Sequence, residues 1–298
     1  MGPSWTDGQM ISASMTIPAG ETVAIDPGAT ITMSSGVTIT VNGTLTASSM
    51  ATHAKLTGSG WTGIVVASGG TVNLNGVDMS GASVALDVHG TAEYDNGTIN
   101  SAAAFNVESG GALTTKKSTF AGNSSACNVA GSFTASYLTY TAAGSSLFDG
   151  IVTTDPAAQL SIEDSMFTGP GPNGPLHDML VSTNGGSAKF HVAYSSITGV
   201  HCGFHFDTLS EFDISYVNND SNAYGAMFYG SGGAGPFTVS YSNFDDNGTN
   251  GTHAYDAEFA NGPIVFDHDH LNGQASDPAG AVSTTNPSSA TVTGTGPR

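Results

Sequence analysis

Acidic and imidazole side chains are concentrated in the second half of the chain. Successive residues of a strand face opposite sides, so His205, between the apolar Phe204 and Phe206, is expected to point outward. The side chains predicted to share this outward face are Asp178, His205, Asp207, Phe228, Asp256 and Glu258, with His177 as a further candidate. Such a face could bind a sugar or Ca²⁺. A solvated polar face on an acidic protein would have the same composition.

Paired carboxylates are also the catalytic groups of glycoside hydrolases. On that alternative, Asp207 and Glu258 would be the catalytic residues of a site beneath the Gly- and Pro-rich loops at 169–175 and 230–236.

Three tyrosines recur at one position of the repeat described below, namely Tyr194, Tyr216 and Tyr241. If their rings are exposed, they would form a stripe for sugar binding. If the rings turn inward at a corner, they belong to the core.

The segment Asp267-His268-Asp269-His270 is the densest local cluster of possible metal ligands. If a strand continues through it, His268 and His270 share one face and could chelate Zn²⁺ or Ni²⁺. No further ligand stands at a recognisable spacing, and polar residues are also needed where a stack of coils ends. No cofactor is predicted, and Ca²⁺ is the ion that acidic turns such as Asp245-Asp246 could hold.

An apolar repeat from Val72 to Leu271 must position these residues. Its copies begin between 20 residues (Val72 to Ala92) and 30 residues (Leu160 to Phe190) apart. The first apolar positions are Val72, Ala92, Leu113, Phe133, Leu160, Phe190, Phe212, Phe237 and Ile264. A second apolar residue usually follows two positions later, and this spacing is typical of a strand. The pattern predicts an all-β chain folded as a parallel β-helix of roughly 10–11 coils.

The repeat also suggests the domain organisation. Residues 1–71 would form the N-terminal cap and first coils, 72–275 the main coils, and 276–298 a low-complexity tail or linker. Cys127 is expected to be a buried free thiol, whereas Cys202 is expected in a turn.

The opening coils resemble a known family. Pro27-Gly28, Gly43-Thr44-Leu45 and Trp61-Thr62-Gly63-Ile64 follow one another before the repeat begins. This series is similar to the start of secreted bacterial right-handed parallel β-helix proteins of the pectin-lyase-like superfamily. The resemblance implies a single right-handed solenoid and export from the cell. That superfamily includes lyases, hydrolases, epimerases and adhesins, so it indicates fold rather than function.

Charge excludes several classes of function. The formal net charge is −19, with only five lysines and arginines, so nucleic-acid binding and binding to anionic membranes are not expected. No apolar run is long enough to span a membrane as a helix. A lyase site for uronates needs basic groups, yet Lys116, Lys117 and Lys189 are scattered. Ice binding by threonines such as Thr30 and Thr32 would need a more regular repeat.

The sequence therefore favours a non-enzymatic, monomeric β-helix module, secreted or at the cell surface. It would serve a structural or adhesive role, or bind a glycan or another surface component. The alternative is a polysaccharide-degrading enzyme, a hydrolase rather than a lyase, with a carboxylate site in the second half.

Overall fold

The computed structural model of this 298-residue chain describes residues 3–182, 188–206, 211–228, 237–244 and 247. It also describes the backbone of the strands at 257–259, 264–271, 282–284 and 290–295. The described residues contain strands and turns but no helix. They divide into two compact units, Met1–Ala143 and Gly144–Arg298.

Each coil of the first unit contributes strands to three sides, named here A, B and C. Side A comprises β1 (Ser4–Trp5), β4 (Thr22–Ile25), β7 (Thr44–Ser48), β10 (Thr71–Asn75), β13 (Thr91–Asp95), β16 (Ala112–Lys116) and β19 (Ser132–Ser136). Side B comprises β2 (Met10–Ile11), β5 (Thr30–Met33), β8 (Ala54–Trp61), β11 (Val77–Ala82), β14 (Thr98–Asn100), β17 (Thr119–Asn123) and β20 (Thr139–Ala142). Side C comprises β3 (Met15–Ile17), β6 (Thr38–Val41), β9 (Gly63–Val66), β12 (Val84–Val88), β15 (Ala103–Val107) and β18 (Cys127–Val129).

The second unit has the same three sides. Its side A comprises β22 (Gln159–Glu163), β25 (Lys189–Ala193), β28 (Glu211–Ser215), β31 (Phe237–Ser240), β34 (Ile264–Leu271) and β36 (Ala290–Thr295). Its side B comprises β23 (Met166–Thr168), β26 (Ser196–Thr198), β29 (Asn218–Asp220) and β32 (Asn243–Phe244), which pairs with the end of β34. Its side C comprises β21 (Ile151–Thr153), β24 (Asp178–Ser182), β27 (Cys202–Phe206), β30 (Tyr224–Phe228), β33 (Ala257–Phe259) and β35 (Val282–Thr284).

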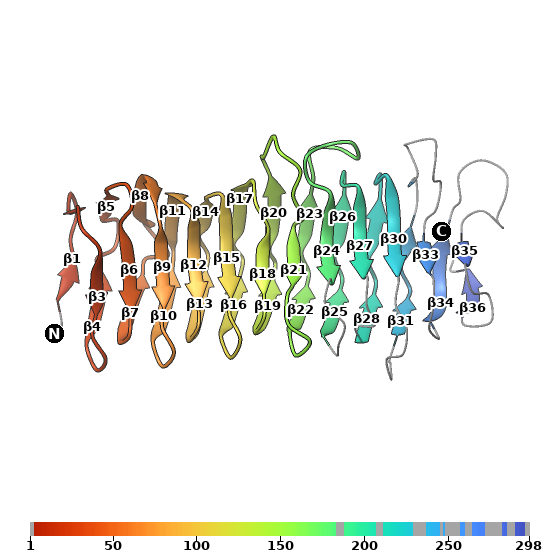
Figure 1. Cartoon of the computed structure of the whole chain (residues 1–298), viewed down its shortest axis with the longest axis horizontal. Helices are drawn as coiled ribbons and strands as arrows, with labels where there is room; N and C mark the ends of the chain where they lie inside the picture. Colours follow the sequence, from red (N-terminus) through yellow and green to blue (C-terminus); the bar gives the residue numbers. More distant parts are fainter. Residues whose placement is uncertain are drawn as a thin grey trace. The chain divides into compact units, whose positions relative to one another are not determined.

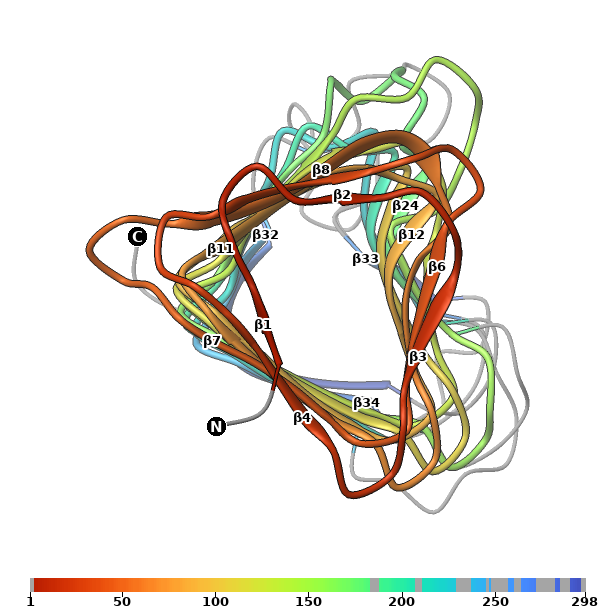
Figure 2. The same ribbon diagram turned by 90° about the vertical axis from the view of Figure 1, so that its left-hand side faces the viewer.

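Every strand pairs in parallel with its counterpart in the next coil of its unit. In Figure 1, β6, β9, β12 and β15 lie side by side in one unit, and β24, β27 and β30 in the other. Figure 2 shows the coils of the first unit end-on, with three sides around a centre. The inward side chains of these strands are buried and fill that centre. The described strands of each unit form successive turns of a parallel β-solenoid. The predicted all-β parallel β-helix is thus confirmed.

The apolar repeat sets the register. Val72 pairs with Ala92, Ala92 with Leu113 and Leu113 with Phe133 in the first unit. In the second unit the same position runs through Leu160, Phe190, Phe212 and Phe237. The side chains described at these positions are almost completely buried. Burial of this continuous column is the main source of stability, because it removes apolar surface from water in every coil.

Buried asparagines connect the coils where side B turns into side C. Asn222 Oδ1 accepts a bond from Val200 N–H at 2.9 Å, and Asn222 Nδ2 donates to Asn219 Oδ1 at 2.8 Å. Asn219 itself occupies an otherwise apolar inward position and is fully buried. In the first unit, Asn123 Oδ1 accepts a bond from Ala104 N–H at 3.1 Å. These amides satisfy buried polar groups that the turns would otherwise leave without partners.

The two cysteines and the two terminal segments can also be compared with the predictions made from the sequence. Cys127 is buried and unbridged, as predicted. Cys202 is also buried and forms no disulfide, but it begins β27 instead of lying in a turn, because the turn ends one residue earlier. At the start of the chain, Trp5 is buried and β1 pairs with β4. Within the segment expected to be a tail, β35 pairs with β33 and β36 with β34.

Candidate functional site

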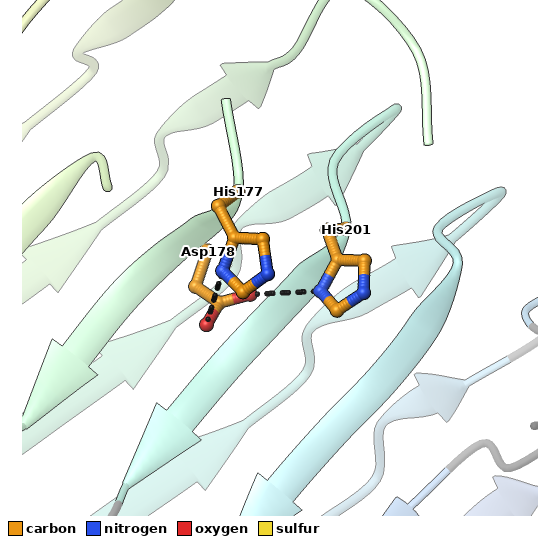
Figure 3. A group of neighbouring side chains, drawn as sticks. All are labelled: His177, Asp178 and His201. Atoms are coloured by element: carbon orange, nitrogen blue, oxygen red, sulfur yellow. Dashed lines mark hydrogen bonds and ion pairs between the residues drawn. The ribbon is translucent and has the colours of Figure 1, made fainter. Parts of the chain in front are cut away.

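A cluster of ionisable side chains lies where side C of the second unit begins. Asp178 is the first residue of β24 and pairs with Cys202, the first residue of β27. His177 and His201 immediately precede these two strands. Parallel register therefore brings both imidazoles to the same end of two adjacent strands, beside the carboxylate of Asp178. Figure 3 shows the three side chains grouped there.

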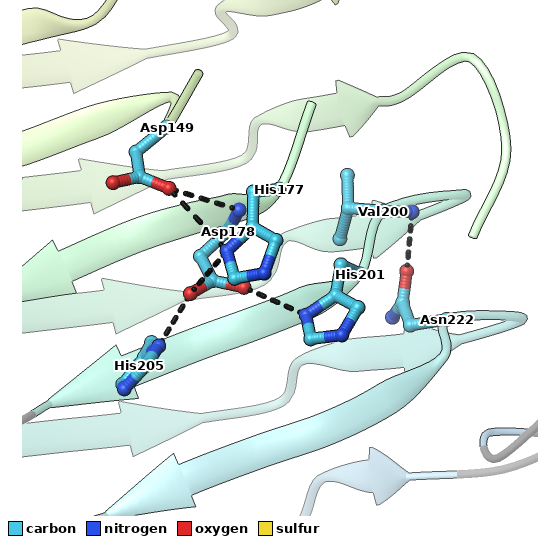
Figure 4. Close-up of polar contacts among 7 residues, drawn as sticks. All are labelled: Asp149, His177, Asp178, Val200, His201, His205 and Asn222. Carbon is cyan, nitrogen blue, oxygen red and sulfur yellow. Dashed lines mark hydrogen bonds and ion pairs between the residues drawn. The ribbon is translucent and has the colours of Figure 1, made fainter. Parts of the chain in front are cut away.

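Three imidazoles converge on the carboxylate of Asp178, which is only 3% exposed. His177 Nδ1 lies 3.0 Å from Asp178 Oδ2, and His201 Nδ1 lies 3.2 Å from Asp178 Oδ1. His205 Nδ1, from within β27, makes a very short contact with Oδ2. In Figure 4, all three rings are directed at this one carboxylate. We call His177, Asp178, His201 and His205 the Asp178 cluster.

The electrostatics of the cluster favour an ionised carboxylate. Burial by itself would raise the pKa of Asp178, but hydrogen bonds from His177, His201 and His205 outweigh burial and hold the pKa well below its ordinary value. Hydrogen bonds to Asp149 and Asp178 raise the pKa of His177 to about 10, although burial opposes this shift. Because an ionised carboxylate only accepts hydrogen bonds, the three Nδ1 atoms must carry the protons.

The backbone around the cluster is fixed by hydrogen bonds that join four successive coils. His177 N–H donates to Phe148 O at 2.8 Å, His201 N–H to His177 O at 2.8 Å, and Tyr224 N–H to His201 O at 2.7 Å. Asp149 adds a second carboxylate, with Oδ1 3.6 Å from His177 Nδ1. The imidazoles of His177 and His201 are stacked, with ring centroids 4.1 Å apart and planes 16° apart. The cluster is thus built on a rigid frame.

The cluster includes two of the residues that the sequence predicted for this face, and His177, which was a further candidate. Asp178 and His205 are brought together, and His205 faces outward between the buried Phe204 and Phe206, as expected. His201 was not predicted, because it stands in a turn where strand alternation gives no indication of its direction. The repeated position of a histidine directly before both β24 and β27 was the signal that could have identified it.

The register differs from the prediction at the next coil. Met227 pairs with His205, and Phe228 pairs with Phe206 of the inward position. Phe228 therefore does not share the column of His205, and the predicted alignment was wrong by one residue. Glu258 does follow in the His205 column, since it pairs with Met227, but its side chain is not described. Asp207, Asp256 and the loop at 230–236 lie outside the described residues.

The three predicted tyrosines lie at the corner between sides A and B. Tyr194, Tyr216 and Tyr241 have left-handed backbone conformations, with φ between 51° and 54°. Their side chains are 59%, 47% and 49% exposed. Tyr194 stacks on Tyr216 with centroids 4.8 Å apart, and Tyr216 on Tyr241 with centroids 5.1 Å apart. They are therefore corner residues whose rings are exposed, and the alternative that the rings turn inward and belong to the core was wrong. We call these three residues the tyrosine stack.

A further polar group lies on side A of the same unit. His191 Nδ1 is 3.3 Å from Asp213 Oδ2, and His191 Nε2 is 3.4 Å from Glu163 Oε1. All three side chains are exposed to a substantial degree. For the predicted metal ligands His268 and His270, only the backbone within β34 is described.

The residue types restrict what the Asp178 cluster can bind. His177, Asp178 and His201 each offer a ligand atom, and these atoms lie within 4.8 Å of one another. Two nitrogen donors and one oxygen donor suit Zn²⁺ and similar ions better than Ca²⁺ or Mg²⁺.

Comparison with known proteins does not assign the chain to a family. No family model, no curated protein and no solved structure matches the chain. Among the described residues, no helix is long and apolar enough to cross a membrane.

Proposed function

We propose that this protein is a non-enzymatic β-solenoid module, secreted or at the cell surface, that binds a linear glycan along the tyrosine stack. The observation that carries the proposal is the set of three parallel, half-exposed phenol rings on successive coils. Exposed aromatic side chains in a row are unusual outside binding surfaces, since each could have been replaced by a small polar residue at a corner.

The orientation of the rings restricts how a ligand can bind. Tyr216 is stacked on both sides, so it presents mainly its edge and hydroxyl to solvent. A tyrosine hydroxyl both donates and accepts hydrogen bonds. One such group on each coil matches a polymer that carries hydroxyl groups at a regular short spacing. A polysaccharide chain lying along the stack would satisfy this pattern.

Neighbouring polar groups support the same ligand class. The strands that lead into the tyrosine corner carry Glu163, His191 and Asp213 on side A. Carboxylates and imidazoles beside aromatic rings are the usual partners of sugar hydroxyls. The net charge of −19 favours a neutral or cationic glycan over an anionic one.

An array of neutral, basic and acidic oligosaccharides tests the proposal. The affinity for each oligosaccharide that binds is then measured by calorimetry. Tyr216→Ala should weaken binding about twofold to tenfold, since it removes a hydroxyl whose hydrogen bond contributes on the order of 0.5–1.5 kcal/mol. Tyr216→Phe keeps the ring and removes the hydroxyl, so an equal loss would assign binding to the hydroxyl.

Tyr137→Ala is the matched control. Tyr137 is also exposed and has a left-handed backbone, with φ of 54°, but it lies in the first unit. Its loss should leave glycan binding unchanged. Absence of binding across the array, or equal effects of the Tyr216 and Tyr137 variants, would reject the proposal. Release of new reducing ends from a bound glycan would instead support the hydrolase.

A further inference from the structure

The Asp178 cluster is unusual in how its charge is balanced. In the described part of the chain, the partners of this buried carboxylate are imidazoles, and no lysine or arginine contacts it. Five basic residues among 298 leave few cations for such a role. A buried carboxylate needs a nearby positive charge, and at this position imidazolium or a bound cation must supply it.

We propose that His177, Asp178 and His201 form the core of a binding site for a divalent transition-metal ion of the Zn²⁺ type. This inference is independent of glycan binding, because it concerns side C and the proposed glycan surface lies at the corner of sides A and B.

The spacing of the ligand atoms is close to what such an ion needs. Zn²⁺ binds histidine nitrogen and carboxylate oxygen at about 2.0–2.1 Å, so neighbouring ligands of a tetrahedral site lie about 3.3 Å apart. The two nitrogen–oxygen pairs in the cluster are already 3.0 Å (His177) and 3.2 Å (His201) apart. An ion that displaces the shared protons would therefore find each nitrogen already close to a carboxylate oxygen, His177 beside Oδ2 and His201 beside Oδ1.

The imidazoles of His177 and His201 must change their relative orientation before both can bind one ion. Their planes are only 16° apart, and parallel stacked rings cannot both direct a nitrogen lone pair at one ion. Rotation of one ring opens the stack. His177 and His201 are 35% and 24% exposed, so a change of rotamer is feasible without unfolding the coil. Both backbones stay fixed by the bonds to neighbouring coils described above.

Other members of the surroundings can complete the coordination. His205 already contacts the same carboxylate oxygen as His177. Asp149 Oδ1 lies 3.6 Å from His177 Nδ1. Either could be a fourth ligand, or water could fill that position as in catalytic zinc sites.

Calorimetry with ZnCl₂ at pH 7.5, on full-length protein pretreated with chelator, tests the site. We expect binding of about one ion per chain, with at least about tenfold weaker affinity in both His177→Ala and His201→Ala. Asp178→Asn should have a similar effect. Circular dichroism of each variant verifies folding, and the two histidine variants suffice if Asp178→Asn does not fold.

Two controls separate this site from others. His53→Ala removes a single histidine–aspartate pair in the first unit, His53 with Asp78, and should leave Zn²⁺ affinity unchanged. The double variant His268→Ala/His270→Ala tests the pair that the sequence suggested. Absence of Zn²⁺ binding up to 100-fold molar excess would overturn the proposal. Binding abolished by the His268/His270 variant but retained in His177→Ala and His201→Ala would overturn it as well.

Discussion

At the scale of single residues, the most informative group is the carboxylate of Asp178. It lies at the start of β24 with almost no solvent exposure, and hydrogen bonds from three histidines keep it ionised. Hydrogen bonds to Asp149 and Asp178 raise the pKa of His177 and keep this side chain protonated to unusually high pH. The two pKa shifts share the hydrogen bond between His177 and Asp178, so their contributions to stability must not be added in full.

This interaction predicts how stability depends on pH in metal-free protein. The folded-state pKa of His177 is raised from 6.5 to about 10. Its contribution is therefore fully present below pH 6.5 and is lost as the pH rises towards 10. The pKa of Asp178 is lowered, so its contribution is present above the ordinary value of 3.8 and declines at more acidic pH.

Urea unfolding from pH 5 to pH 10, with chelator present, measures this dependence. We expect the free energy of unfolding to fall between pH 6.5 and pH 10, and His177→Gln to flatten that fall. His53→Gln should leave the slope as in the unaltered protein. An equally steep alkaline fall in His177→Gln would show that another group is responsible.

At the scale of strands and turns, the close approach of neighbouring coils explains the Trp61-Thr62-Gly63 motif. Trp61 is buried, and its Nε1 donates to Ser80 O at 2.9 Å. Gly63 begins β9 with φ of +132°, and a Cβ there would overlap the carbonyl oxygen of Val84 in the next coil. Only glycine permits both this backbone conformation and this contact.

Gly63→Ala should consequently destabilise the first unit strongly. Gly69 also has positive φ, +83°, but a Cβ there would meet open space. Gly69→Ala should therefore cost about 1 kcal/mol from backbone strain alone. Gly63→Ala adds a steric clash and should cost about 3 kcal/mol or more.

Hydrogen exchange followed by mass spectrometry would locate the effect. In Gly63→Ala, loss of protection should be greatest in β6, β9 and β12, because each coil bonds mainly to the coils beside it. Equal destabilisation by the two substitutions would show that backbone conformation, and not the contact with Val84, decides the cost.

At the scale of the whole molecule, the charge is strongly one-sided. The chain contains 24 acidic residues and only five basic ones. Such a charge repels itself more in the compact state than in the unfolded chain, and salt screens this repulsion. We expect the melting temperature to rise by a few degrees between 10 mM and 200 mM NaCl. A thermal melt followed by circular dichroism measures it, with equal ionic strength of KCl as the control. A melting temperature that falls with salt would mean that attractive ion pairs dominate instead.

The inward-facing apolar positions of this structure could be predicted from the sequence. The apolar positions from Val72 to Phe237 indicated parallel coils, and their register within each unit follows that repeat. Turn lengths were harder to interpret. The predicted alignment of Phe228 with His205 was wrong by one residue, and a slip of one residue moves a side chain to the other face of a strand.

The candidate sites, too, were only partly predictable from the sequence. The sequence by itself determined that Tyr194, Tyr216 and Tyr241 recur at one position, because a constant offset within a repeat is visible without coordinates. Only the tertiary structure decided that their rings are exposed and parallel. It also decided that His177, Asp178, His201 and His205 meet. Their contacts join residues from two coils, and turns of variable length set which side chains face each other across that junction.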